Sequence, residues 1–220
     1  MLLEIACFNL ESCLIAQKTG ANRIELCKNY SVGGITPSEK LIIEVRKQIR
    51  IDLFVMIRPR EGNFVYSDSE FELMKKQIVF CKEKNCNGVV FGILTKENKI
   101  DVVRCKELVE LAKPMSSTFH RAFDEIENSE SALEEIIECD FLRILSSGKQ
   151  KTAIEGSVLL SQLIKKSKGR IIIMPGGGIR SSNISEIIKT TGGAEFHSAA
   201  ITNTGEIADE VEIKKLISAF

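Results

Sequence analysis

The chain alternates short runs of β-branched and other apolar residues with longer segments of helical periodicity, and this alternation restricts the folds open to it. Successive runs begin roughly 20 to 36 residues apart, which is about the length of one strand–helix unit. The eight runs are Leu2–Cys7, Arg23–Cys27, Leu53–Arg58, Gly88–Ile93, Ser116–His120, Phe141–Leu145, Arg170–Met174 and Ala194–His197. Strands that alternate strictly with helices predict a parallel sheet covered by helices.

Eight such units within 220 residues fit a compact (β/α)8 barrel of the TIM type. The alternative is an open doubly wound sheet, which usually has fewer strands and often a GxGxxG motif after its first strand. Here the first run ends in Cys7-Phe8-Asn9, without that motif, and no linker or low-complexity tract divides the sequence. We therefore predict an α/β protein with one TIM-type barrel domain over residues 1–220.

The amino-acid composition limits the binding partners and the cellular compartment that we expect for this protein. The 30 basic and 30 acidic side chains give a net charge of zero, which argues against general binding to nucleic acid or to an anionic membrane. No apolar run approaches the roughly 20 residues that span a bilayer, and the start lacks the basic region of a signal peptide. The seven cysteines have no CxxC spacing, so we expect reduced thiols. We expect a soluble, cytoplasmic protein, and a homo-oligomer because such barrels often associate.

The alternation of side chains along each strand predicts a polar barrel interior. Helices cover the outside of the barrel, so the apolar residues of each run must face outward and the intervening residues inward. This places an unusual set of charged or titratable side chains inside: Glu4, Arg23, Glu25, Arg58, His120, Arg143, Glu195 and His197. Buried charges must be paired, so one interpretation is a set of structural ion pairs, to which we assign Arg23.

The other interpretation is a functional site, because barrel enzymes build their sites at the carboxyl ends of the strands. The inward residues that meet this condition are Glu25, Arg58, His120 and His197, and the following loops add Arg60, Arg121 and Asp124. The run Gly176-Gly177-Gly178 follows the seventh strand, where barrels commonly hold phosphate, and His197-Ser198 would supply the second half of such a site. The alternative for the glycines is a tight turn without a ligand.

Several motifs in one order resemble those of the CutC family, described as copper homeostasis proteins. The matching segments are Gly20–Cys27, Gly33–Ser38, Phe54–Arg60, Tyr66–Asp68, Gly88–Gly92, Thr118–Asp124 and Met174–Gly178. The resemblance covers about residues 3 to 200 and implies a TIM-type barrel in the cytoplasm. It also implies a copper site at Cys7 and Cys27, where thiolates would suit Cu(I). Strand alternation places Cys27 on the inward face with Glu25 but Cys7 on the opposite face, so a shared ion requires a bend at the strand end.

Three functions remain open. The first is copper handling by Cys7 and Cys27, with Met56 as a further soft donor. The second is an enzyme acting on a phosphorylated or otherwise anionic small molecule, with the glycine run on the anion, Arg58 and Arg60 on a second acidic group, and Glu25 or His120 moving a proton. The third is a binding or scaffold module whose polar interior is structural. The resemblance favours the first function, and the chemistry of the residues favours the second.

Overall fold

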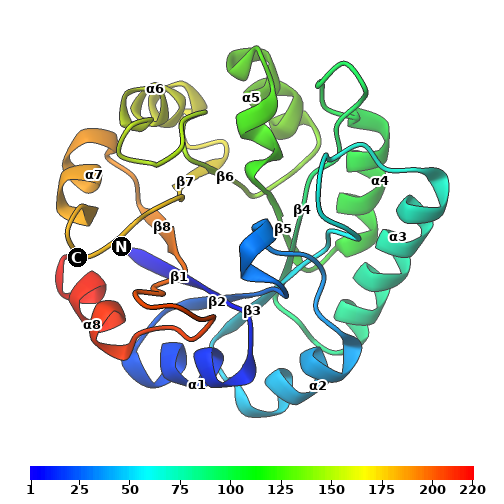
Figure 1. The fold of residues 1–220 in the computed structure, drawn as a ribbon. Helices are drawn as coiled ribbons and strands as arrows, with labels where there is room; N and C mark the ends of the chain where they lie inside the picture. The colour runs from blue at the N-terminus through cyan, green and yellow to red at the C-terminus, as the bar shows by residue number, and fades with distance from the viewer.

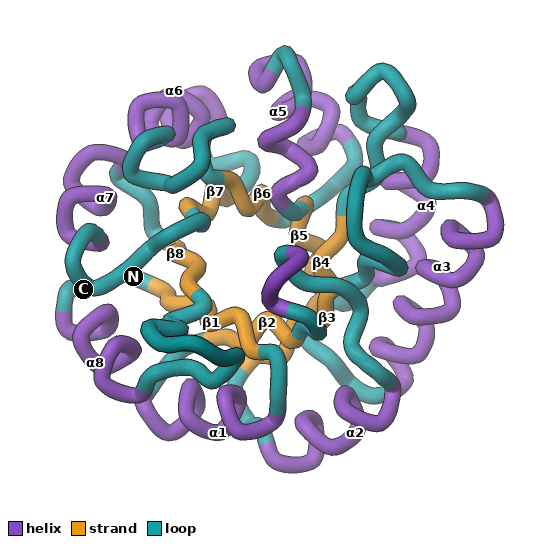
Figure 2. The backbone as a smooth tube through the Cα atoms, in the orientation of Figure 1, coloured by secondary structure: helices purple, strands orange, loops and turns teal.

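Eight parallel strands surround a central axis, and the helices that follow them form an outer ring (Figures 1 and 2). The computed structural model describes residues 1–220. The strands are β1 (Leu2–Cys7), β2 (Arg23–Leu26), β3 (Asp52–Met56), β4 (Gly88–Phe91), β5 (Ser116–Phe119), β6 (Arg143–Ser146), β7 (Ile172–Pro175) and β8 (Glu195–Ser198). The helices are α1 (Leu10–Thr19), α2 (Glu39–Gln48), α3 (Asp68–Glu83), α4 (Val102–Ala112), α5 (Ser129–Glu138), α6 (Ser157–Ser167), α7 (Ile184–Thr191) and α8 (Glu210–Ser218). The predicted (β/α)8 TIM-type barrel is confirmed.

The barrel closes between β7 and β8. Neighbouring strands follow the order β7-β6-β5-β4-β3-β2-β1-β8, and a single parallel bridge from Gly176 to His197 joins the two ends. A Cβ on Gly176 would lie 2.4 Å from Leu145 Cδ1 and 3.2 Å from the His197 Cβ, so only glycine permits this approach. The first glycine of the predicted anion loop is therefore also part of the barrel closure.

Four strands, β2 to β5, end one or two residues earlier than the sequence pattern predicts. The third predicted run extends to Arg58, whereas β3 ends at Met56. The N–H of Arg58 donates to Thr36 Oγ1 at 2.8 Å, instead of to a neighbouring strand. The fifth run was predicted to reach His120, but a 3₁₀ helix begins at Arg121 and β5 ends at Phe119. These early ends place Arg58 and His120 at the rim of the barrel.

The predicted alternation is confirmed inside the barrel, where charged side chains form one connected layer. Arg23 donates from Nε to Glu4 at 2.5 Å and from Nη2 to Glu195 at 2.6 Å. Arg143 Nε reaches the same Glu195 oxygen at 3.2 Å. Both guanidinium groups lie over the Phe54 ring, 4.9 and 5.0 Å from its centroid. Two arginines and two glutamates balance one another, as buried charges require.

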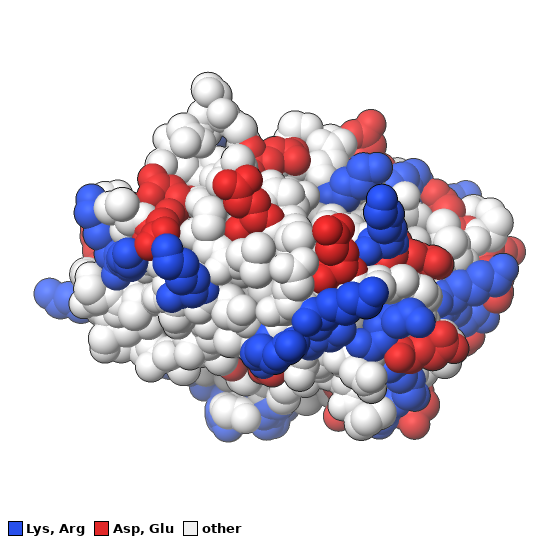
Figure 3. All heavy atoms as spheres, turned by 90° about the horizontal axis from the view of Figure 1, so that it is seen from below, with Lys and Arg blue, Asp and Glu red and all other residues white.

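The outer faces of the strands pack against the helices in a large apolar cluster that includes Ile24, Leu26, Val55 and Ile57. All seven cysteines are free and buried. Basic and acidic side chains lie next to one another on the face shown in Figure 3, as the balanced composition leads one to expect. None of the helices combines the length and the apolar character needed to cross a membrane.

We predict that Arg23→Met strongly destabilises the barrel, because it leaves Glu4 and Glu195 buried without their shared partner. The expected loss is about 3–5 kcal/mol in the free energy of unfolding, measured by urea denaturation. The control is Arg170→Met, which removes an arginine paired with Glu134 where both side chains are 43–44% exposed. It should change stability little. Equal effects of the two substitutions would contradict a structural role for the inner layer.

Candidate functional site

The carboxyl end of the barrel contains two adjoining cavities. The large cavity has a volume of about 250 Å³ and lies among the loops after β1, β2, β5, β7 and β8. It is lined by Ala6, Phe8, Glu25, Tyr30, Gly33, Arg121, Gly177, Gly178, Arg180, His197, Ser198 and Ala199. The small cavity, of about 80 Å³, shares Glu25, Gly33, Arg121 and His197 with it and is otherwise lined by Met56, Arg58, Phe64, His120 and Leu145. Such a concave, polar region at the strand ends is the usual place for a barrel's binding site.

The glycine loop after β7 lines the large cavity through Gly177 and Gly178. These residues have φ values of +99° and +70°, which side-chain-bearing residues rarely adopt. The Gly178 N–H donates to no protein acceptor, whereas the Gly177 N–H lies at the bridge between Gly176 and His197. A Cβ on Gly177 would lie 3.1 Å from the Ser147 Cβ and 3.5 Å from Arg121 Nη1. The loop therefore brings backbone of the cavity wall close to a guanidinium group.

Arg121 and Arg180 add positive charge on either side of this loop. Arg121 is held by Asp124 Oδ2 at 2.9 Å from its Nε and by Ser147 Oγ at 2.7 Å from its Nη2. Arg180 donates from Nη1 to the Ile179 carbonyl at 2.8 Å and from Nη2 to the Ile201 carbonyl at 3.0 Å. Each guanidinium group is thus fixed by its own surroundings before any ligand binds.

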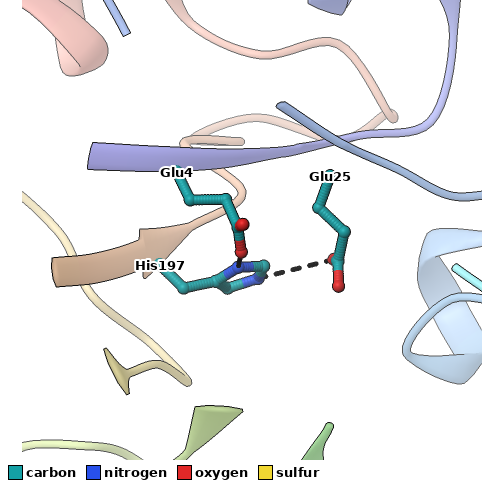
Figure 4. Close-up of side chains that lie close together, drawn as sticks. All are labelled: Glu4, Glu25 and His197. Atoms are coloured by element: carbon teal, nitrogen blue, oxygen red, sulfur yellow. Dashed lines mark hydrogen bonds and ion pairs between the residues drawn. The ribbon is translucent and has the colours of Figure 1, made fainter. Parts of the chain in front are cut away.

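Three titratable side chains from adjacent strands meet beside the loop (Figure 4). Glu4 of β1 accepts a hydrogen bond at Oε1 from His197 Nδ1 of β8, at 2.7 Å, and its other oxygen faces Arg23. On the opposite side of the ring, His197 Nε2 is 3.9 Å from Glu25 Oε2 of β2. Strand register explains the grouping, because Glu4 pairs with both Arg23 and His197 across the sheet. One donor atom from each of Glu4, Glu25 and His197 lies within 4.8 Å of the others.

Burial and neighbouring charges shift the pKa values of Glu4, Glu25 and His197 in different directions. Burial opposes ionisation of Glu4, but Arg23 and His197 outweigh it and lower the Glu4 pKa to about 2. Burial raises the pKa of Glu25. Burial alone would lower the pKa of His197, but the carboxylates of Glu25 and Glu4 raise it. Glu4 is therefore an anion at neutral pH, whereas Glu25 and His197 form a buried pair in which the pKa of each group is raised.

The second histidine, His120, has a different environment in the small cavity. Its Nδ1 accepts a hydrogen bond from the Ala122 N–H at 3.3 Å, and its ring lies 4.7 Å from that of Phe64. Burial and the positive charge of Arg58 lower its pKa to about 3, so the ring is neutral at physiological pH. Its buried Nε2 has no hydrogen-bond partner.

Arg58 closes the wall beside His120. Its Nη1 donates to the carbonyls of Val32 and Gly34 at 2.9 and 3.0 Å, and its Nη2 donates to that of Gly62 at 2.8 Å. Only Nε, which is buried, lacks a partner. Arg58 therefore lines the small cavity, but three of its N–H donors are hydrogen-bonded to carbonyl groups of the surrounding loops.

Three other residues expected at the site form hydrogen bonds with the surrounding protein. Arg60 lies outside both cavities, because Glu70 Oε1 accepts from its Nε at 2.6 Å. Asp124 also lies outside them and accepts from the Ser146 hydroxyl at 2.6 Å. Ser198 lines the large cavity, but its hydroxyl donates to the Ile179 carbonyl at 2.8 Å and joins the two loops. The structure brings Glu25, His197 and the glycine loop together, whereas Arg60 pairs with Glu70 and Asp124 holds Arg121.

Cys7 and Cys27 lie on opposite faces of the sheet, as the alternation indicates. The Cys27 N–H donates to the Cys7 carbonyl at 2.9 Å, so the backbones are adjacent. The Cys7 side chain belongs to the helix-facing cluster, whereas that of Cys27 belongs to the inner cluster with Met56. Burial raises the pKa of both thiols. No bend brings the two sulfur atoms to one face.

Arg180 was not expected at the site. It stands two positions after the glycine run, and a cation following a glycine-rich turn is the signal that identifies it. Phe8 and Tyr30, whose rings are 5.2 Å apart, form an aromatic edge of the large cavity. Phe8 follows β1 and Tyr30 begins a short 3₁₀ helix after β2, where strand periodicity gives no direction for a side chain.

The amino-acid sequence is similar to those of known proteins. A sequence model described as the CutC family matches residues 1–202. The chain belongs to the CutC family. It is 44% identical over 199 residues to the human "Copper homeostasis protein cutC homolog", covering 90% of this chain and 73% of that one. It is 46% identical over 200 residues to a family protein CutC of Parabacteroides distasonis, covering 90% and 82% of the two chains.

Solved structures agree. The putative copper homeostasis protein CutC of Streptococcus agalactiae superimposes with a TM-score of 0.87 at 34% identity, covering 92% of this CutC-family chain and 100% of the other. The phosphoribosylanthranilate isomerase of Thermotoga maritima superimposes with a TM-score of 0.65 at 16% identity, covering 100% and 97%. The latter likeness concerns the barrel fold alone.

We predict that the two histidines titrate far apart. Nitrogen-15 NMR should show His120 neutral from pH 8 to pH 5 with its proton on Nε2, because its pKa is lowered to about 3 and Nδ1 accepts from a backbone N–H. His197 should titrate above its ordinary value, because two carboxylates flank it. The chain has only two histidines, so one His120→Gln variant assigns both signals. A His120 that gains charge between pH 7 and pH 5 would contradict the described environment.

Proposed function

We propose that this CutC-family protein is an enzyme that binds a phosphorylated small molecule in the large cavity and moves a proton on it. The observation that carries the proposal is that Gly177, Gly178 and the Arg121 guanidinium line the same cavity as Glu25 and His197.

The anion-binding half rests on the glycine loop. Backbone N–H groups that lack protein partners, combined with nearby guanidinium groups, attract a dianion such as a phosphate ester. Arg121 and Arg180 are already fixed by their own hydrogen bonds, so little conformational entropy is lost when a ligand binds. Loops after the seventh and eighth strands commonly hold phosphate in this fold.

The proton-transfer half rests on Glu25 and His197. A general base works best when its pKa lies near the working pH, and burial raises the pKa of Glu25 in that direction. His197 stands 3.9 Å from Glu25 and is anchored by Glu4, so it can relay a proton between the carboxyl group and the cavity. His120, the alternative proton carrier from the sequence, is too weak a base because its pKa is about 3.

We predict that phosphate esters raise the melting temperature and that Gly177→Asp abolishes the effect. At a ligand concentration of about 100 times Kd, the stabilisation is about 2.7 kcal/mol, or roughly 5–10 °C for a chain of this size. The control is Gly192→Asp, because Gly192 also has a positive φ, of +70°, but no neighbour within 4 Å of its Cβ position. If no phosphate ester stabilises the wild type, or if both variants respond alike, the glycine loop is not an anion site.

Copper binding is the second candidate function, because relatives carry the name copper homeostasis protein. The predicted Cys7–Cys27 pair does not fit one ion, since the two thiols occupy opposite faces. Soft donors do meet elsewhere: a Cβ on Gly34 would lie 3.2 Å from Cys27 Sγ and 3.7 Å from Met56 Cε. Thiolate and thioether sulfur suit Cu(I), and Glu25 Oε2, 3.3 Å from Cys27 Sγ, can accept the thiol proton.

For this candidate, we predict that Cys27→Ser and Met56→Leu each weaken Cu(I) binding under reducing conditions, measured by competition with a chromogenic chelator. Cys13→Ser is the matched control, because Cys13 is equally buried but belongs to the helix-facing cluster. Cys7→Ser should resemble this control. Undiminished binding after both Cys27→Ser and Met56→Leu would exclude copper from the barrel interior.

A further inference from the structure

We propose that the substrate presents a carbonyl group to the small cavity, where His120 donates a hydrogen bond to the carbonyl oxygen and Glu25 removes a proton from the adjacent carbon. The inference rests on the proposed function and narrows its substrate class to phosphorylated hydroxy-aldehydes or hydroxy-ketones. It is carried by two unpartnered buried atoms, His120 Nε2 and Glu25 Oε1, whose side chains line the same small cavity.

The hydrogen bond from the Ala122 N–H determines which group His120 offers. A nitrogen that accepts cannot carry the ring proton, so Nδ1 is bare and Nε2 bears the hydrogen. The positive charge of Arg58 and the burial of the ring keep it uncharged. Gly92 leaves room for this orientation, because a Cβ there would lie 2.8 Å from Nδ1. His120 thus presents a neutral N–H donor, which can stabilise a developing oxyanion without giving up its proton.

Glu25 supplies the complementary acceptor. Its Oε2 is engaged by the Cys27 thiol at 3.3 Å and lies 3.9 Å from His197 Nε2, but Oε1 has no partner. Buried polar atoms in proteins are almost always hydrogen-bonded, so an unpaired acceptor and an unpaired donor beside one cavity indicate groups kept for a ligand. The cavity volume of about 80 Å³ exceeds the roughly 10–15 Å³ needed for one water molecule and admits a small polar group.

The two cavities fit two ends of one molecule. Glu25, Gly33, Arg121 and His197 line both, so a ligand with its phosphate at Gly177 and Gly178 can extend its other end toward His120. Arg58 already donates three hydrogen bonds to loop carbonyls, so fewer than half of its N–H donors are left to clamp a second anion. This favours an uncharged carbonyl over a carboxylate at the inner end.

The chemistry that follows is balanced without a co-reactant. The Glu25 carboxylate takes a proton from the carbon next to the carbonyl, and the electron pair of that C–H bond forms a carbon–carbon double bond. The carbonyl π electrons move to oxygen, where the His120 N–H stabilises the enolate. Return of the proton to the neighbouring carbon, with transfer of the hydroxyl proton to the enolate oxygen, moves the carbonyl by one position. The net reaction is an isomerisation.

The test compares matched probes that differ only in the carbonyl group. Dihydroxyacetone phosphate should bind the wild-type protein about tenfold more tightly than glycerol 3-phosphate, which is the contribution of one hydrogen bond. The same comparison is made with ribulose 5-phosphate and ribitol 5-phosphate. Calorimetry should show this preference lost in His120→Phe and largely kept in His120→Gln, whose amide retains an N–H donor. In D2O, wild-type protein should exchange the protons next to the ketone, and Glu25→Gln should not.

The outcomes separate this inference from the proposed function. If no phosphate compound binds, the anion site itself is wrong. If both members of each pair bind equally well and Gly177→Asp abolishes both, the anion site stands and the carbonyl inference fails. Should His120→Phe not fold, the wild type decides the question. Its His120 Nε2–H NMR signal should shift with dihydroxyacetone phosphate and not with glycerol 3-phosphate, and an identical response to both would overturn the inference.

Discussion

The structure depends on how charge is neutralised inside the barrel. Arg23 lies between Glu4 and Glu195, and Arg143 completes the layer from the opposite side above the Phe54 ring. Ions in such a position are tolerated only when each is paired, and the pairs then fix the positions of the strands that carry them. Because the pKa of Glu4 is lowered to about 2, this carboxylate stays ionised at neutral pH.

This charged layer also positions the site above it. Glu4 uses one oxygen for Arg23 and the other for His197, so the ring of His197 is oriented by the layer beneath. Above the layer, hydrogen bonding becomes incomplete: Glu25 Oε1, Arg58 Nε and His120 Nε2 lack partners. The charged layer is thus paired, whereas three of the five unpartnered buried side-chain atoms belong to residues that line the small cavity. Unpaired buried atoms destabilise a fold, so their concentration beside a cavity indicates a function there.

The barrel and its inward-facing charges could be predicted from the sequence, because strand alternation has a fixed period. Apolar Ile24 and Leu26 require Arg23 and Glu25 to face inward, and the contacts agree. The same rule places Cys7 and Cys27 on opposite faces. The alternation of side chains in strands does not predict where side chains in loops point, however. Arg60 turns to Glu70, and Arg180 reaches the cavity through contacts made only after folding. The neutral state of His120 depends on burial and on the charge of Arg58, which comes from a distant part of the sequence.

The glycine loop lies where the barrel closes between β7 and β8. A single bridge between Gly176 and His197 joins β7 to β8, whereas other neighbouring strands share longer ladders. Strand pairs with few hydrogen bonds separate most readily in local opening. Under the proposed function, a ligand held by the glycine loop on one side and by the loop of Ser198 on the other would span this junction. Binding would then stabilise the closed sheet, so we expect the filled barrel to open less readily between β7 and β8 than the empty barrel.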